Sequence, residues 1–180
     1  MSVIMLRGSS DGSLAGVEGG ALVTAPLLDW EKAVADGDAY AWTNATYDPD
    51  ANDTILGVQN TSTTRDLYIQ KAWVNSDTAT QFVVHTSSGV TMAGTAITGV
   101  NLNRGSSNAA PATAKADETG NGQQAASYTG RIMTGYVAAD GLVEIDLSGL
   151  ILPYNWMVGI DLTTAATGSV MTIWGFFKDK

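Results

Sequence analysis

The chain has 180 residues, no cysteine, and 18 acidic against 9 basic residues, so its formal net charge at pH 7 is −9. A chain of this length can form one domain with a full hydrophobic core. The lack of cysteine excludes disulfides, thiolate zinc sites and cysteine nucleophiles, and the acidic balance argues against nucleic-acid binding, which requires clustered lysine and arginine.

The distribution of apolar residues disfavours two further classes of protein. No apolar run approaches the length of about 18 residues that a membrane span requires, and the opening MSVIMLRGSS lacks the apolar stretch of a secretory signal. We therefore expect a soluble protein made in the cytoplasm, with neither a membrane nor a nucleic acid as its partner.

Residues 1–36 are predicted to form an N-terminal arm followed by a short helix. Residues 1–20 are rich in glycine and serine, which are costly to order without a partner surface. Pro26–Gly37 then has proline at its start and glycine at its end, as helices do. One face of this helix would be apolar, formed by Leu27, Trp30, Ala33 and Val34.

Residues 37–180 are predicted to form a single β domain. Short apolar runs separated by Asn, Ser, Thr, Asp and Gly indicate strands near residues 40, 54, 67, 80, 96, 131, 142, 156 and 170. Eight or nine strands at this spacing predict an all-β fold, an antiparallel β-sandwich. We favour a jelly roll over an immunoglobulin-type sandwich because of the number and length of the strands.

Alternation along the strands predicts which side chains share a face. In LYIQKAWV it groups Leu67, Ile69 and Trp73 on one side, and Tyr68, Ala72 and Val74 on the other. Further along the chain it predicts that Glu144 and Asp146 point outward and that Val143, Ile145 and Leu147 point inward. It also groups Trp156 with Val158, Ile160 and Leu162, opposite Met157, Gly159 and Asp161.

Two segments do not fit a simple half-buried strand. Val170–Phe177 is apolar on both faces, so the arm, the helix or a second subunit must cover it. Asn103–Ala125 is a long polar segment with one proline and three glycines, predicted to be an exposed contact loop.

Four sequence segments are similar to those of a known group of proteins. They are the polar turn Asn60–Arg65, AGTAITGVNLNRGSSNAAPATAK (Ala93–Lys115), GDAYAWTNATYD (Gly37–Asp48) and LPYNWMVGIDLTT (Leu152–Thr164). Together they resemble virion structural proteins of tailed bacteriophages, over the chain from Gly37 to its C-terminus. The resemblance implies a head decoration (cement) or head-fibre protein with a sandwich fold.

Catalytic and metal sites find little support among the candidate residues. His85 is the only histidine and therefore the obvious candidate base, but its place after Phe82–Val84 predicts a strand-end or surface residue, and no G-x-S-x-G motif accompanies it. Asp48, Asp50 and Asp53 resemble half of a calcium loop without its glycine and closing glutamate. The four glutamates, expected in the arm, the helix, the long loop and on an outward strand face, are Glu18, Glu31, Glu118 and Glu144. They do not form the opposed pair that glycoside hydrolysis needs.

Exposed aromatic residues would suggest sugar binding, because sugar rings stack on them. Most of the tryptophans lie in strands where core packing is expected, namely Trp42, Trp73, Trp156 and Trp174. The tyrosines near predicted loops are Tyr128, Tyr136 and Tyr154. A carbohydrate- or receptor-binding module of a fibre or tail tip is therefore the alternative function.

The expected function is that of a non-enzymatic decoration protein on the capsid surface of a phage virion, made in the host cytoplasm. Its partners would be the phage major capsid protein and itself, as a homotrimer. No catalytic, cofactor-binding or metal-binding residue is assigned, and no cofactor is expected.

Overall fold

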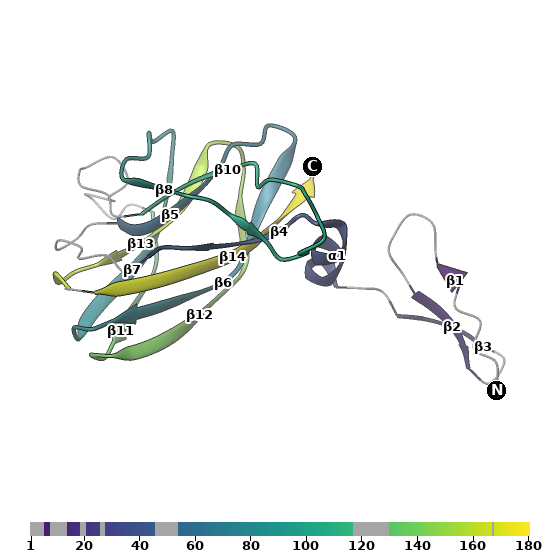
Figure 1. The fold of residues 1–180 in the computed structure, drawn as a ribbon, viewed down its shortest axis with the longest axis horizontal. Coiled ribbons are helices and arrows are strands. Elements are labelled where there is room, and N and C mark those ends of the chain that lie inside the picture. Colours follow the sequence, from purple (N-terminus) through teal and green to yellow (C-terminus); the bar gives the residue numbers. More distant parts are fainter. Residues whose placement is uncertain are drawn as a thin grey trace.

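The computed structural model describes residues 6–7, 14–18, 21–25, 28–45, 54–116, 130–166 and 168–180. Most of them belong to two antiparallel sheets that pack face to face (Figure 1). The five-stranded sheet contains, in order, β12 (Gly141–Leu152), β6 (Arg65–Ser76), β14 (Ser169–Asp179), β4 (Ala39–Thr43) and β9 (Val100–Asn101). The six-stranded sheet contains, in order, β11 (Arg131–Val137), β7 (Thr80–Ser88), β13 (Trp156–Leu162), β5 (Thr54–Asn60), β10 (Ala112–Ala116) and β8 (Thr95–Ile97).

The connectivity of the two sheets is that of a jelly roll. The chain alternates between the sheets along β4, β5, β6 and β7, and it alternates back along β11, β12, β13 and β14. Each strand of the second half pairs with one of the first half in nested order: β11 with β7, β12 with β6, β13 with β5 and β14 with β4. The predicted all-β jelly-roll sandwich is therefore confirmed.

The core lies between the sheets and is made of apolar side chains from both. Trp42, Ile69 and Ile173 of one sheet and Val58 and Ile160 of the other are fully buried in it. Such burial supplies most of the stabilising free energy of a domain that has no disulfide.

One extra residue in β6 changes which side chains face this core. Trp174 of β14 pairs with Lys71, but the next residue, Gly175, pairs with Ile69, so Gln70 is skipped as in a β-bulge. The expected grouping of Leu67 and Ile69 with Trp73 is therefore wrong. After the bulge the core face is continued by Ala72 and Val74, and the outer face carries Tyr68 and Trp73.

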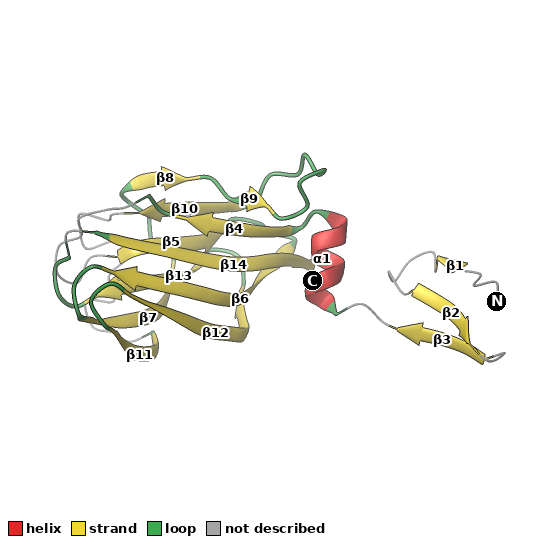
Figure 2. Cartoon of the chain, turned by 60° about the horizontal axis from the view of Figure 1, so that its bottom comes forward, coloured by secondary structure: helices red, strands yellow, loops and turns green. Residues whose placement is uncertain are grey.

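Helix α1 (Asp29–Asp36) lies close to its expected position and covers part of the outer face of β14. It ends at Gly37, which takes the left-handed conformation (φ 79°) that glycine accepts most easily. The Trp30 ring stacks on Trp174, with centroids 5.9 Å apart and planes 10° apart, and meets Phe176 edge-on at 5.9 Å. The apolar outer face of β14 is thus covered from within the same chain, at the end of the sandwich seen in Figure 2.

Two expectations about irregular segments are revised by the structure. The stretch expected to be an arm contains three short strands, β1 (Leu6–Arg7), β2 (Leu14–Glu18) and β3 (Ala21–Ala25), which form an antiparallel sheet of their own. The expected long loop Asn103–Ala125 contains β10, which pairs with β5 and β8 inside the larger sheet. Its residues 117–125 lie outside the described residues.

Candidate functional site

His85 is buried within β7 of the six-stranded sheet, between its neighbours β11 and β13, which corrects the expectation of a strand-end or surface residue. It lies in β7 with no exposed area, and Asp161 of β13 is also buried. The His85 Nε2 atom is 2.9 Å from Asp161 Oδ1, which also accepts a hydrogen bond of 2.8 Å from Thr54 Oγ1. The three side chains form a polar cluster, called here the His85 cluster, on the sheet face that points away from the core.

The chemistry of the His85 cluster is that of a buried hydrogen-bonded group. An ionised carboxylate only accepts hydrogen bonds, so the contact with Asp161 fits a His85 ring with a proton on Nε2. Nδ1 is buried and has no hydrogen-bond partner. A base would need its free nitrogen to reach a substrate, and no part of His85 is exposed to solvent. What the geometry shows is that the cluster links β5, β13 and β7 through buried hydrogen bonds.

Two of the other sequence candidates, Glu31 and Glu144, have described side-chain contacts, and each has its own partner in a different part of the fold. Glu31 accepts a hydrogen bond from the Leu28 N–H at the start of α1, and Glu144 pairs with Lys71 on an exposed strand face. Asp48, Asp50, Asp53, Glu118 and Tyr128 lie outside the described residues, and for Glu18 only its place in β2 is described. Among the described residues, no group of three or more acidic or histidine side chains could hold a metal ion.

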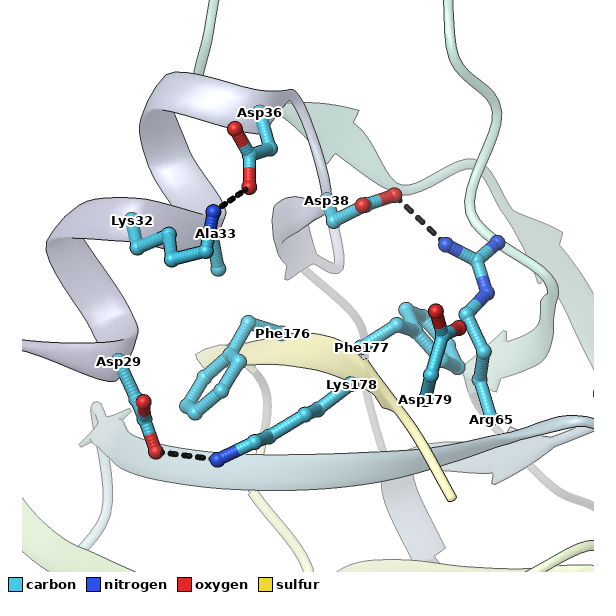
Figure 3. A pocket seen from close by; sticks show the side chains of 10 residues that line it. All are labelled: Asp29, Lys32, Ala33, Asp36, Asp38, Arg65, Phe176, Phe177, Lys178 and Asp179. Carbon is cyan, nitrogen blue, oxygen red and sulfur yellow. Dashed lines mark hydrogen bonds and ion pairs between the residues drawn. The ribbon is translucent and has the colours of Figure 1, made fainter. Parts of the chain in front are cut away.

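A charged pocket of about 350 Å³ lies between α1 and the ends of β6 and β14 (Figure 3). Each of its three cations already has a carboxylate partner: Lys32 pairs with Asp36 at 2.9 Å, Arg65 with Asp38 at 2.7 Å and Lys178 with Asp29 at 2.7 Å. The hydrogen bond that the Lys178 ammonium donates to Asp29 raises the pKa of Lys178. The Lys32–Asp36 pair lies within α1, whereas the other two pairs tie the helix and the chain after it to the sandwich, so the cations that line the pocket already have partners.

Exposed apolar side chains occur on β11 and β12, which are edge strands of the two sheets. They are Ile132, Met133, Tyr136, Leu142 and Ile151, called here the edge surface. Tyr136 lies on the outer face of the six-stranded sheet and Leu142 on the outer face of the five-stranded sheet. Tyr136 is 64% exposed and Leu142 is 67% exposed. The two strands follow one another in the chain and lie side by side in Figures 1 and 2. The alternation pattern did not single out these residues, because edge position depends on the whole topology.

Two more exposed aromatic residues flank the turn between β12 and β13. Tyr154 is 51% exposed and Trp156 is 41% exposed, so the expectation that Trp156 packs in the core is wrong. Trp156 is the first residue of β13, where the strand leaves the turn, whereas Met157–Leu162 are buried on both faces of the sheet. Tyr136 and Tyr154 are thus both at the surface, and Trp42 is in the core.

Comparison with known proteins finds no matching family model, no matching curated protein and no matching solved structure. Within the part of the chain that the structure describes, no helix has the length and apolar character of a membrane span.

Proposed function

We propose that this chain is a structural subunit of a tailed-phage virion, a head decoration protein that binds the assembled capsid lattice and stabilises it. The proposal combines the resemblance of the phrases between Gly37 and Thr164 with one structural observation, the edge surface on β11 and β12. A jelly roll occurs in many proteins of unrelated function, so the fold alone does not support this proposal.

The edge surface supports a role in assembly because it combines apolar side chains with unpaired strand edges. Among the described residues, β11 and β12 each have a sheet neighbour on one side only. An exposed edge of this kind presents N–H and C=O groups to another chain, and the exposed apolar side chains on both edge strands would be buried by such a chain. The occupant we propose is a second copy of this chain, in a homotrimer.

The remaining parts of the chain have separate tasks in this proposal. The sandwich makes the trimer, and the stretch of residues 1–25, which includes β1–β3, reaches the major capsid protein or a neighbouring subunit. A subunit that binds only the assembled lattice stabilises it by its own binding free energy, so the shell becomes harder to open. No catalytic step is part of this function.

The test is to add the purified protein to capsids of its phage that lack it. Co-sedimentation would measure occupancy, and negative-stain images would locate the bound protein. We expect regular decoration of the shell and a higher temperature of capsid disruption.

A chain without residues 1–25 is the second variant. It should keep the sandwich fold, because the deletion leaves α1 and every sandwich strand in place, and it should bind capsids much more weakly. Protein found at a tail tip or fibre instead of on the shell would overturn the proposal, as would a lack of binding by the intact chain. Equal occupancy by the shortened chain would show that residues 1–25 do not hold the capsid.

A further inference from the structure

The turn that joins β12 to β13 presents two large aromatic side chains to solvent. Tyr154 and Trp156 stand two residues apart and are about half exposed. Exposed tyrosine and tryptophan side chains form binding sites more often than other residues, because they offer a large contact area with few rotatable bonds. Neither residue contributes to the edge surface or to the His85 cluster.

The backbone of this turn is held in place by its neighbours. Asn155 has a positive φ of 65°, a conformation that asparagine tolerates better than most residues. Its N–H donates to Asn60 O at 2.9 Å, and its C=O accepts from the Gly89 N–H at 3.0 Å. Its side-chain Oδ1 accepts from Gln59 Nε2 at 3.1 Å. The two aromatic residues therefore extend from a backbone fixed by hydrogen bonds to two segments, which lowers the entropy that a ligand must remove on binding.

The segments bonded to the turn are polar and contain no charged residue, although the Lys180 ammonium donates a hydrogen bond to Thr63 O at the far end of one of them. The segments bonded to the turn are 59–64, QNTSTT, and 86–94, TSSGVTMAG, and together with 153–160 they contain no Asp, Glu, Lys or Arg. Ser88 pairs with Trp156 across the strands, and the Ser88, Thr61 and Thr91 side chains are exposed. The surface thus offers hydroxyl and amide groups beside aromatic rings, in contrast to the ion pairs around α1.

We propose that Tyr154 and Trp156 form a binding site for a neutral oligosaccharide. The apolar C–H face of a sugar ring stacks on an aromatic ring, and the sugar hydroxyls exchange hydrogen bonds with uncharged hydroxyl and amide groups. An acidic glycan or a nucleic acid would need cations, which these segments lack. This site is separate from the edge surface, so glycan binding does not depend on assembly with the capsid.

The test is a glycan array that carries neutral, sialylated and sulfated oligosaccharides, probed with the full chain. We expect binding to neutral glycans. Titration calorimetry with the strongest neutral oligosaccharide should then give an affinity at least about tenfold lower for Tyr154→Ala and for Trp156→Ala. Trp156→Phe, which keeps an aromatic ring, should recover part of the affinity if Trp156→Ala destabilises β13. Tyr136→Ala, at an exposed aromatic residue of the edge surface, is the matched control and should bind like the wild type.

Three results would overturn this assignment. They are a lack of binding to every neutral glycan on the array, binding to anionic glycans only, and unchanged affinity in both alanine variants. A change of oligomeric state in Trp156→Ala, without a change in glycan binding, would mean that a second copy of the chain covers the turn. Capsid binding by the same variants should stay at the wild-type level, which separates failure of this site from failure of the decoration function.

Discussion

Gly159 lies opposite His85 on neighbouring strands, and the imidazole fills the space that a side chain at Gly159 would occupy. A Cβ atom at this position would lie 2.6 Å from His85 Nε2 and 2.7 Å from Cε1. Both distances are shorter than any van der Waals contact, so His85 can reach Asp161 only because residue 159 has no side chain.

Gly159→Ala should therefore destabilise the protein by about 2–3 kcal/mol, because His85 must move and Asp161 loses a hydrogen bond. Urea unfolding of the wild type and the variant would measure this change in the free energy of unfolding. Gly105→Ala is the control, since its new Cβ would come no closer than 3.5 Å to another atom. If the two variants were equally stable, the close contact between Gly159 and His85 would be contradicted.

Removal of the His85 imidazole should also lower the free energy of unfolding, whereas a change at a surface histidine would alter it little. His85→Leu leaves the buried Asp161 with Thr54 as a hydrogen-bond donor but without the donor on β7, and should cost about 3 kcal/mol. His85→Gln retains a side-chain N–H and should cost less. A double-mutant cycle that combines His85→Leu with Asp161→Asn should show non-additive changes in the free energy of unfolding. Additive changes would argue against the hydrogen bond between the two residues.

The contact between α1 and the sandwich should depend on one aromatic side chain. Trp30→Ala removes the stack on Trp174 and the edge contact with Phe176 and should cost about 2 kcal/mol. Leu28→Ala is the control, because Leu28 is 69% exposed beside the helix. Near-ultraviolet circular dichroism should report the loss of the stacked tryptophan pair in the first variant only. The same spectrum in both would contradict the stack.

Alkaline pH should destabilise the fold through Tyr40. Burial raises the pKa of its phenol above 10.0, the neighbouring Asp38 carboxylate adds to the rise, and the phenol donates a hydrogen bond to Gly37 O. Because the folded state holds this proton more tightly, the contribution is complete below pH 10 and is lost as the pH rises through the higher folded-state pKa. We expect the free energy of unfolding to fall less steeply above pH 10 in Tyr40→Phe than in the wild type. Parallel pH curves would refute this.

Self-association should depend on the edge surface. Tyr136→Glu combined with Leu142→Glu places two charges among its apolar side chains, and light scattering should then give the mass of one chain where the wild type gives three. Thr164→Glu combined with Ala165→Glu adds the same charge at an exposed turn and should leave the wild-type mass. A monomeric wild type at micromolar concentration would remove the basis for the homotrimer.

The strands were predictable from the sequence where alternation and turn residues agree. Glu144 and Asp146 point outward and Ile145 and Leu147 inward as expected, and the helix ends at the glycine that marked its end. The error in β6 arose because one extra residue reverses the alternation, and nothing in LYIQKAWV identifies Gln70 as that residue. Strand β10, ATAKA, lacks β-branched and aromatic residues apart from one threonine, so only its pairing with β5 and β8 makes it a strand.

The site was less predictable than the fold. The burial of His85 depends on Asp161, which is 76 residues away, and on the glycine beside it. The exposure of Tyr136 and Leu142 depends on which strands end up at the edges of the two sheets. Both features depend on how the strands are arranged in the two sheets, so the residue pattern within one strand does not predict them.

The nested pairing of the jelly roll also determines when the protein can fold during its synthesis. β13 lies between β5 and β7, and β14 lies between β4 and β6, so the last two strands of the sandwich in chain order occupy the middle of the two sheets. Until residues 156–179 have left the ribosome, the earlier strands of each sheet have no strand to join them across its centre. The sandwich can therefore close only after these residues have been made, and a chain cut before residue 156 would have two divided sheets and an exposed apolar interior.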